Sequence, residues 1–286
     1  MSRYPAGVKS RLAALAAVVL WASLAPLAIL LPQIPPFLKT GIGLLIGSLL
    51  ALPLARFDFK RLVVNPKTLL LGVYGLFGYH AALFLALQTA PSVQANLVNY
   101  LWPLLIVLLA PLFLKSSGLS LRLLIAALVG FAGAAMAVLS GGATSGGFEI
   151  GYLFALLAAL IWATYSLGTT AVGNFSTAAV GLFAFVAGAL AVVAHFLFEP
   201  SVVITSDDWL LLALLGIGPL GAAFYFWDFA LKHGNPQQVG LLSFLTPLLS
   251  TTLLVLITGE AFSYLLLISA FLITAGALLG RERTRR

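Results

Sequence analysis

The stretch NLVNYLWPLLIVLLAPLFL, residues 96–114, decides the fold of this chain. It is apolar enough to cross a bilayer, since a spanning helix needs roughly 20 apolar residues at about 1.5 Å of rise each. Its first part nevertheless carries two amides, Asn96 and Asn99, two amphipathic rings and the helix breaker Pro103. Such groups are costly in hydrocarbon unless protein or a wet cavity satisfies them. The stretch therefore predicts a bent transmembrane helix with one polar face towards the protein interior.

Composition extends this conclusion to the full length. Of the 286 residues, 62% are hydrophobic and 8% are charged, and the mean hydropathy is +1.11. A soluble domain needs about a quarter charged residues to cover its surface, so this chain must use the bilayer as its solvent. Cysteine is absent, which excludes disulfides, a thiolate nucleophile and cysteine-based metal sites.

Ten segments are long and apolar enough to span a membrane. Backbone hydrogen bonding in lipid favours helices over open sheets, so we predict an all-α integral membrane protein with ten transmembrane helices. The predicted spans are 12–31, 36–54, 67–88, 92–114, 121–140, 150–171, 177–198, 209–231, 237–258 and 262–280.

The chain repeats itself. LALQTAPSVQANLVNYLWPLL (85–105) aligns without gaps on FALKHGNPQQVGLLSFLTPLL (229–249), at an offset of 144 residues. LWAS (20–23) matches IWAT (161–164) in the same sense. Five spans is an odd number, so the second half must enter the membrane from the opposite side. This predicts an inverted repeat, an arrangement that many transporters use for alternating access.

The boundary between the halves is marked by the glycine-rich stretch GGATSGG, residues 141–147, which is typical of a linker. We assign residues 1–141 to the first five-helix repeat and 148–286 to the second, inverted one. Both repeats are expected to form one unit around a central cavity.

Positive charge gathers on one side of the predicted membrane. All Lys and Arg residues except Lys39 fall at the chain ends or near loops that the ten spans place on the N-terminal side. The positive-inside rule then predicts that both termini are cytoplasmic. The net charge of +7 reflects this topology, so we expect the lipid bilayer as a partner and no nucleic acid.

Two prolines mark equivalent depths in the two halves. In the repeat alignment Pro103 falls on Pro247, and Asn99 falls on Ser243. Each proline lies near the middle of its span and frees the carbonyl group four residues earlier, which belongs to Asn99 or Ser243. We interpret both prolines as hinges, and Ser243 as a substrate-binding residue.

The residues before Pro103 share a helix face. Asn96, Asn99, Tyr100 and Pro103 follow i, i+3, i+4 and i+7 spacing, and Trp102 lies on the flank of this face. We interpret the face as the lining of a substrate cavity. The alternative is that the proline merely kinks the helix and that the amides bond between helices.

Further substrate-binding candidates lie deep in other spans. Trp21 and Trp162 occupy equivalent positions about 15–20 Å into their spans, too deep for an interfacial aromatic belt. Tyr79 and His80 lie in the third span, and intramembrane ionisable groups are functional candidates. Tyr225 of the eighth span completes the set. Core packing is the alternative for the tryptophans, and an interhelical hydrogen bond is the alternative for His80.

Asp228 has a structural interpretation, because Lys232 follows it at i+4 near the end of the eighth span and predicts an ion pair. No HExxH, GxSxG, Walker or metal-spaced motif occurs in the sequence. The deep core offers one histidine and no clear carboxylate, so we predict no enzyme activity, catalytic residue, metal or cofactor.

The ten spans, the two five-helix halves and the paired W-A-[ST] and N/S-Y/F-L-x-P-L-L stretches resemble the drug/metabolite transporter superfamily, specifically its EamA-type members. The NYLWP motif, with His80 upstream, is similar to the corresponding motif of the aromatic amino acid exporters of that superfamily. The resemblance implies a basket-shaped monomer of the bacterial inner membrane, with the first, third, fourth, sixth, eighth and ninth helices around a central cavity. It also implies export of aromatic amino acids and of aromatic cations such as methyl viologen.

Carried over by position, the resemblance marks Tyr79, His80, Tyr100, Trp102 and Trp162 as substrate-facing. Two alternatives stay open. One is a carrier of the same superfamily for other small metabolites, such as threonine- or homoserine-like amino acids or lipophilic cations. The other is a membrane sensor or scaffold that transports nothing.

Overall fold

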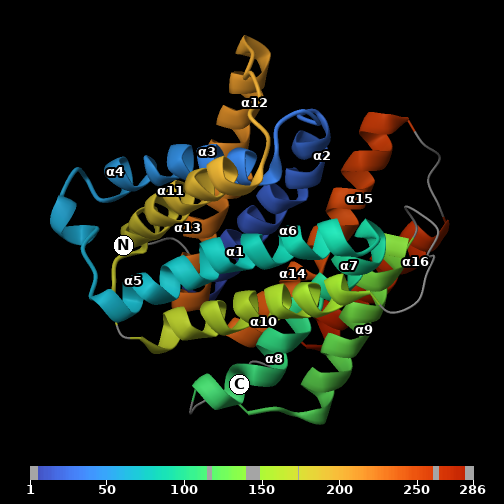
Figure 1. Cartoon of the computed structure of the whole chain (residues 1–286). Coiled ribbons are helices and arrows are strands. Elements are labelled where there is room, and N and C mark those ends of the chain that lie inside the picture. Colours follow the sequence, from blue (N-terminus) through green and yellow to red (C-terminus); the bar gives the residue numbers. More distant parts are fainter. Residues whose placement is uncertain (1–5, 115–117, 140–148, 173, 260–263, 281–286) are drawn as a thin grey trace.

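The computed structural model describes residues 6–114, 118–139, 149–172, 174–259 and 264–280, and every regular element among them is helical (Figure 1). Eight helical segments are long and apolar enough to cross a membrane, and two shorter apolar helices, Leu121–Met136 and Tyr264–Leu279, complete the ten predicted spans. The ten-helix prediction is confirmed. The predicted linker, Arg3 and the basic residues from Arg281 onwards lie outside the described residues.

The first half contains spans 1 to 5, and spans 1 to 4 are each interrupted. The elements are α1 (Ala6–Ala22) and α2 (Leu24–Ile29) in span 1; α3 (Pro36–Ser48) and α4 (Ala51–Leu54) in span 2; α5 (Pro66–Val73), the π-helical turn η2 (Tyr74–Gly78) and α6 (Tyr79–Thr89) in span 3; α7 (Ser92–Asn99) and α8 (Trp102–Phe113) in span 4; and α9 (Leu121–Leu139) in span 5. The 3₁₀ turn η1 (Phe59–Arg61) lies between spans 2 and 3.

The second half contains spans 6 to 10. Its elements are α10 (Ile150–Ala171) in span 6; the 3₁₀ turn η3 (Thr177–Ala179) and α11 (Val180–Phe198) in span 7; α12 (Ser206–Ile217), the π-helical turn η4 (Gly218–Ala222) and α13 (Ala223–His233) in span 8; α14 (Pro236–Ser243) and α15 (Leu245–Thr258) in span 9; and α16 (Tyr264–Leu279) in span 10.

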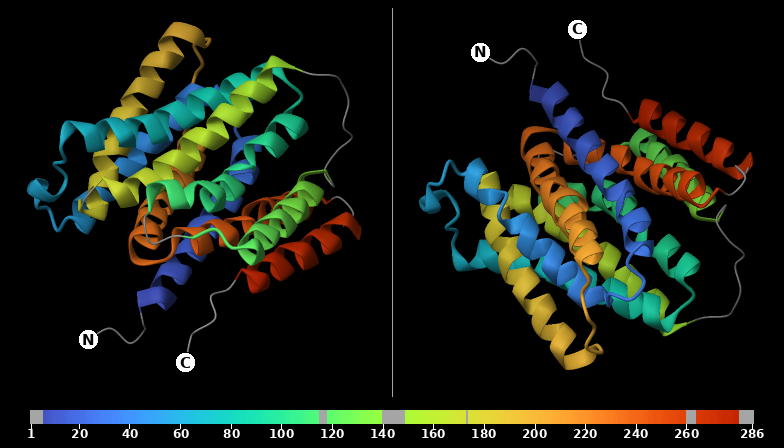
Figure 2. Two further views of the ribbon diagram at one scale, coloured as in Figure 1. Left: turned by 90° about the horizontal axis from the view of Figure 1, so that it is seen from below. Right: turned by 90° about the horizontal axis from the view of Figure 1, so that it is seen from above.

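Contacts between the spans follow a two-fold pattern. The most extensive packing joins α9 to α16 and α3 to α11, which pairs span 5 with span 10 and span 2 with span 7. Figure 2 shows α9 and α16 side by side in both views. Span 6 packs on spans 3 and 4, and span 1 packs correspondingly on spans 8 and 9. Exchanging each span with the one five places later therefore converts these contacts into one another.

One matched contact shows that the two halves run in opposite directions. The Ser10 hydroxyl, near the start of span 1, donates to the Ala230 carbonyl oxygen near the end of span 8, at 2.8 Å. Gly151, near the start of span 6, lies against the Ala86 carbonyl oxygen near the end of span 3, 2.6 Å from where a Cβ on Gly151 would be. Ala86 and Ala230 differ by the repeat offset of 144 residues. Because successive spans alternate in direction, the ends of spans 3 and 8 lie at opposite ends of the bundle. The starts of spans 1 and 6, which contact them, therefore lie at opposite ends as well.

Small residues allow the closest helix approaches. A Cβ added at Gly47 would lie 2.6 Å from the Gly221 Cα atom, so α3 and η4 touch backbone to backbone. Gly72 and Gly75 similarly receive the aromatic rings of Phe183 and Tyr165. In a bilayer such packing replaces the hydrophobic driving force between helices.

Polar ties hold two loops at opposite ends of the bundle. Because the spans alternate in direction, Lys9, Arg61, Lys67, Arg122 and Lys232 all lie at one end, called the basic side from here on. At the opposite side, the carboxylate of Glu199 accepts hydrogen bonds from the Phe37 and Leu38 amides at 2.7 and 3.2 Å. This carboxylate satisfies free N–H groups at the start of α3.

The Asp228–Lys232 ion pair that the sequence predicts is confirmed at the basic side, with 2.8 Å between Lys232 Nζ and Asp228 Oδ2. Thr177 of η3 donates to the same carboxylate oxygen at 2.6 Å, and Lys232 donates to the Phe175 carbonyl oxygen at 3.0 Å. The pair therefore fastens the turn between spans 6 and 7 to span 8.

Candidate substrate site

Four tryptophans from four different spans meet in the centre of the bundle. They are Trp21 of α1, Trp102 of α8, Trp162 of α10 and Trp227 of α13, called the tryptophan cluster from here on. Every pair of their rings lies within contact range, with centroids 5.1 to 6.4 Å apart. Most pairs are edge-to-face or tilted, the arrangements that aromatic quadrupoles favour.

Other rings extend the cluster towards span 3. Phe224 and Tyr165 contact Trp162 at centroid distances of 5.8 and 5.3 Å, and Tyr79 contacts it at 5.2 Å. His80 lies against Tyr79 and Phe224 at 5.1 and 6.4 Å. The centre of the bundle therefore presents aromatic rings to whatever enters it.

The cluster is closed in this structure. Trp102, Trp162 and Trp227 are only 4%, 3% and 1% exposed, and Trp21 is partly buried. The sequence predicts that Trp21, Trp102 and Trp162 line an open cavity, whereas here their rings fill the space between them. A ring-shaped guest would need these four side chains to separate, and it would replace contacts that they make with one another.

The polar groups beside the cluster are an imidazole, a phenol and an amide. His80, which is 6% exposed, bonds through Nδ1 to the Leu76 carbonyl oxygen at 2.6 Å. Leu76 belongs to the π-helical turn η2, where the usual helical hydrogen-bond pattern is shifted. Asn99 is 3% exposed and its amide Nδ2 donates to the Tyr79 hydroxyl at 3.2 Å.

Asn96 and Tyr100 are partly buried on the same span, as their shared face predicts. The other two candidates, Tyr225 and Ser243, have hydroxyl groups that are bonded elsewhere in the protein. Tyr225 points away from the cluster, and its hydroxyl donates to the Gly47 carbonyl oxygen of α3 at 3.0 Å. Ser243 is fully buried and donates to the Gly240 carbonyl oxygen of its own helix at 2.6 Å. Both hydroxyls therefore have structural partners.

Three aromatic residues of the site are missing from the set predicted from sequence. They are Trp227 of the tryptophan cluster and Phe224 and Tyr165, which contact the cluster. Span 8 is apolar on all sides, so its sequence does not show which of its neighbouring aromatic residues faces inward. The one usable signal was Trp227 itself, a large amphipathic ring at mid-depth whose indole N–H needs a partner. It donates to the Ser166 hydroxyl at 3.0 Å.

Interruptions of the helices surround the site at repeat-related positions. Span 4 breaks between Asn99 and Trp102, and span 9 breaks at Phe244, directly before Pro103 and close before Pro247. The π-helical turns η2 and η4 begin at residues 74 and 218, which differ by the same 144 residues as the two breaks. Sequence reasoning placed hinges at the prolines and did not predict η2.

The two ends of the bundle differ around the site. At the basic side α8 of span 4 packs on α14 of span 9, where a Cβ added at Gly240 would lie 3.3 Å from the Pro103 carbonyl oxygen. The repeat-related pair, α7 and α15, makes no comparable contact among the described residues. Asn96 occupies the position in span 4 that Gly240 occupies in span 9. Spans 4 and 9 are therefore packed together at the basic side and are not comparably packed at the opposite side.

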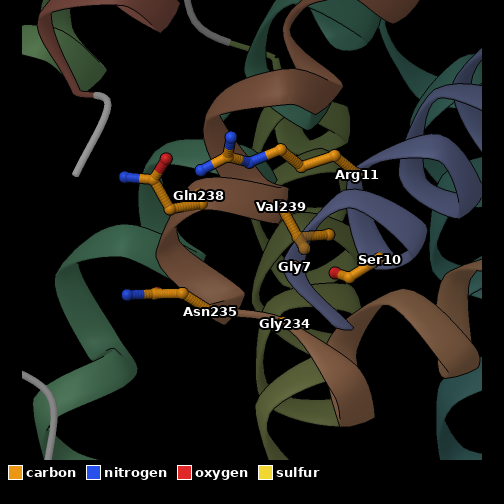
Figure 3. A pocket seen from close by; sticks show the side chains of 7 residues that line it. All are labelled: Gly7, Ser10, Arg11, Gly234, Asn235, Gln238 and Val239. Carbon is orange, nitrogen blue, oxygen red and sulfur yellow. The ribbon is translucent and has the colours of Figure 1, made fainter. Parts of the chain in front are cut away.

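A small pocket of about 60 Å³ lies apart from the site, at the start of α1 and the turn between spans 8 and 9. Figure 3 shows the Arg11 side chain extending over the start of α14 towards Gln238. Arg11 is ten residues before Trp21 on one helix, or about 15 Å away. The pocket is therefore separate from the tryptophan cluster.

Ten antiparallel apolar helices in two inverted halves, closed over an aromatic centre, define a multi-pass membrane transporter. A family model for the EamA-like transporter family matches residues 9–139 and 149–280, one match for each half. The chain belongs to the EamA-like transporter family.

Two relatives bear the same name. The chain is 39% identical over 279 residues to the aromatic amino acid exporter YddG of Ancylobacter novellus, covering 94% of this chain and 96% of that protein. It is 29% identical over 247 residues to the aromatic amino acid exporter YddG of Escherichia coli, covering 80% and 82%. A solved crystal structure superposes with a TM-score of 0.89 at 36% identity, over 96% of this chain and 98% of that one. These matches exclude an enzyme interpretation and establish a transporter of small molecules.

Proposed function

We propose that this protein exports aromatic amino acids across the bacterial inner membrane by alternating access. The observation that carries the proposal is the tryptophan cluster, because four mutually contacting indoles at mid-membrane suit a guest that is itself an aromatic ring. Stacking or edge contacts with such a guest are worth about 0.5–1.5 kcal/mol each beyond area burial. The names of the two relatives support the same substrate class.

The uncharged polar groups around the cluster support a zwitterionic cargo. Tyr79, His80 and Asn99 offer hydroxyl, imidazole and amide groups, and the aromatic faces can receive an ammonium by cation–π contact. An arginine or aspartate pairing each end of the cargo would bind it more tightly, whereas a carrier has to release it on the far side. Moderate binding by neutral groups suits that task.

The orientation that we propose for the protein in the membrane follows from its charge distribution. The positive-inside rule places the basic side in the cytoplasm, with both termini there. The packing of α8 on α14 then represents a state closed towards the cytoplasm. A monomer suffices for this cycle, since both repeats that must exchange shapes belong to one chain.

The test is a substrate panel in proteoliposomes of the purified protein. Labelled tryptophan and phenylalanine should cross and compete with each other, and threonine should neither cross nor compete. Preferred flux of threonine would favour a carrier for other metabolites, and absence of any flux would favour a sensor or scaffold. Methyl viologen, a flat aromatic dication, is a second candidate cargo because the indole faces suit cation–π binding. It belongs in the same panel as a competitor.

A further inference from the structure

Two polar atoms at the centre of the protein are buried without hydrogen-bond partners. Asn99 is 3% exposed and Thr246 is 6% exposed, yet neither Asn99 Oδ1 nor Thr246 Oγ1 is hydrogen-bonded. An unpaired polar atom in a buried site is unfavourable, because it has given up its hydrogen bonds to water. Such a cost is understandable where a ligand supplies the missing bond.

Neighbouring residues show that the protein could have satisfied both atoms. Hydroxyl groups in transmembrane helices commonly bond to the carbonyl oxygen four residues earlier. Thr164 and Thr252 do so at 2.7 and 2.8 Å, and Thr246 does not. Ser243, the repeat-related counterpart of Asn99, is likewise bonded within its own helix. Of these five side chains, Asn99 and Thr246 each keep an atom without a partner, whereas the hydroxyls of Ser243, Thr164 and Thr252 are bonded within their own helices.

The positions of the two residues connect them to the site. Asn99 ends α7 at the break of span 4, and Thr246 is the second residue of α15 after the break of span 9. Thr246 is the repeat-related counterpart of Trp102, so a small hydroxyl side chain takes in the second half the place of an indole in the first. Spans 4 and 9 pack together on the basic side of these two residues, with Gly240 of α14 against the Pro103 carbonyl oxygen of α8, whereas α7 and α15 are not comparably packed among the described residues.

The chemistry of the two atoms is complementary to an amino acid head group. Asn99 already uses its amide donor on Tyr79, which leaves its carbonyl Oδ1 as an acceptor. Thr246 has a hydroxyl that can donate. We propose that Asn99 Oδ1 accepts a hydrogen bond from the substrate ammonium and that Thr246 Oγ1 donates one to the substrate carboxylate. The head group then lies between the breaks of spans 4 and 9, and the aromatic ring lies in the tryptophan cluster.

This proposal rests on the proposed function, and it is tested with ligands that each lack one half of the head group. Tryptamine has the ammonium without the carboxylate, and indole-3-propionate has the carboxylate without the ammonium. The variants are Asn99→Leu and Thr246→Val, which keep the size of each side chain while removing its hydrogen-bonding groups. The readout is the inhibition constant of each ligand against labelled tryptophan uptake into proteoliposomes.

The expected result is a crossed pattern. Thr246→Val should weaken tryptophan and indole-3-propionate by about tenfold and leave tryptamine unchanged, since a hydrogen bond to a charged group is lost. Asn99→Leu should weaken tryptophan and tryptamine and leave indole-3-propionate unchanged. Thr246→Ser should keep the parent affinities. Thr252→Val is the matched control, because its hydroxyl already bonds to its own helix, and it should change nothing.

Equal effects of one variant on both analogues, or no effect on either, would overturn the assignment. So would an analogue that fails to compete with tryptophan in the parent at any concentration, since each half of the head group has its own contact. Failure of the proposed function looks different, because the parent would then not transport tryptophan at all.

Discussion

The two halves of the molecule share the backbone irregularities nearest the site and differ in the side chains beside them. A π-helical turn in spans 3 and 8 and a break in spans 4 and 9 recur at an offset of 144 residues. Trp21 and Trp162 are matched too. The other side chains of the site differ between the halves. Tyr79, His80, Asn99 and Trp102 of the first half correspond, in this order, to Ala223, Phe224, Ser243 and Thr246 of the second.

This difference separates two tasks. Features that recur in both halves are those that let a helix bend, as alternating access between inverted repeats requires of each half in turn. Features present in only one half cannot be needed for that exchange. The unmatched side chains are therefore the ones to which we assign recognition of the substrate.

The strongest test of this distinction replaces a side chain of the first half by its counterpart from the second half. Trp102→Thr removes one member of the tryptophan cluster and should lower tryptophan uptake per folded molecule at least tenfold. Replacing a buried aromatic by a small residue also costs about 3–5 kcal/mol of stability. Uptake must therefore be divided by the amount of folded protein recovered after purification.

The matched control for Trp102 is Trp209, the remaining tryptophan of the chain. Trp209 lies on α12, is 50% exposed and has no place in the cluster. Trp209→Thr should leave uptake per folded molecule unchanged. If both variants transport alike, Trp102 is a packing residue and the assignment of recognition to the unmatched side chains is wrong.

A smaller effect is expected at Gly240, which permits span 9 to pack on span 4. Gly240→Asn introduces the side chain that the first half has at Asn96. Its Cβ would lie 3.1 Å from Ile106 Cγ2 and 3.3 Å from the Pro103 carbonyl oxygen, tighter than ordinary contact. The basic side should then open more often and uptake should slow a few-fold.

Thiol labelling can report this opening because the chain has no cysteine of its own. Val239→Cys introduces a thiol at a position that is 1% exposed on α14. It should be labelled faster in the Gly240→Asn background, and not in a Gly7→Asn background, where an added side chain meets open space. Equal labelling in both backgrounds would mean that Gly240 does not hold the basic side closed.

The fold was predictable from sequence to a greater extent than the site. Hydropathy located all ten spans because lipid requires continuous apolar helices, and the aligned prolines marked the breaks at Asn99 and Phe244. The same lipid hides the site, since a span that is apolar all round does not show which face turns inward. Hence Tyr225 was selected where Trp227 faces the centre.

The interruptions in spans 1 and 3 were missed for different reasons. Span 1 breaks at Ser23, and Pro26 lies four residues after Ala22, the last residue of α1, but this proline has no partner in the repeat alignment that was used. Span 3 contains η2, which holds no proline. A π-helical turn shifts backbone hydrogen bonds by one residue, which depends on packing against other helices more than on the local residues. In span 3 that packing is Gly75 against the ring of Tyr165, a contact between segments far apart in sequence.

The smallest effects are expected from the prolines, where the two halves agree. Pro103 and Pro247 stand just after the breaks in spans 4 and 9, and neither can donate a hydrogen bond to the carbonyl oxygen four residues earlier. Replacing either with alanine restores an N–H that can bond to Asn99 or Ser243 across the break. One added bond is worth about 0.5–1.5 kcal/mol, so each variant should melt slightly higher and turn over a few-fold more slowly.

Because the halves are inverted, the two alanine variants should be biased towards opposite sides of the membrane. Labelling of Val239→Cys at the basic side and of Leu27→Cys on α2 at the opposite side should therefore change in opposite senses in the two backgrounds. A change in the same sense would show that the breaks do not act as repeat-related hinges. If both variants turn over and label like the parent, bending must be assigned to the other shared feature, the π-helical turns η2 and η4. Those turns lie in spans 3 and 8 at matched positions and are intact in both variants.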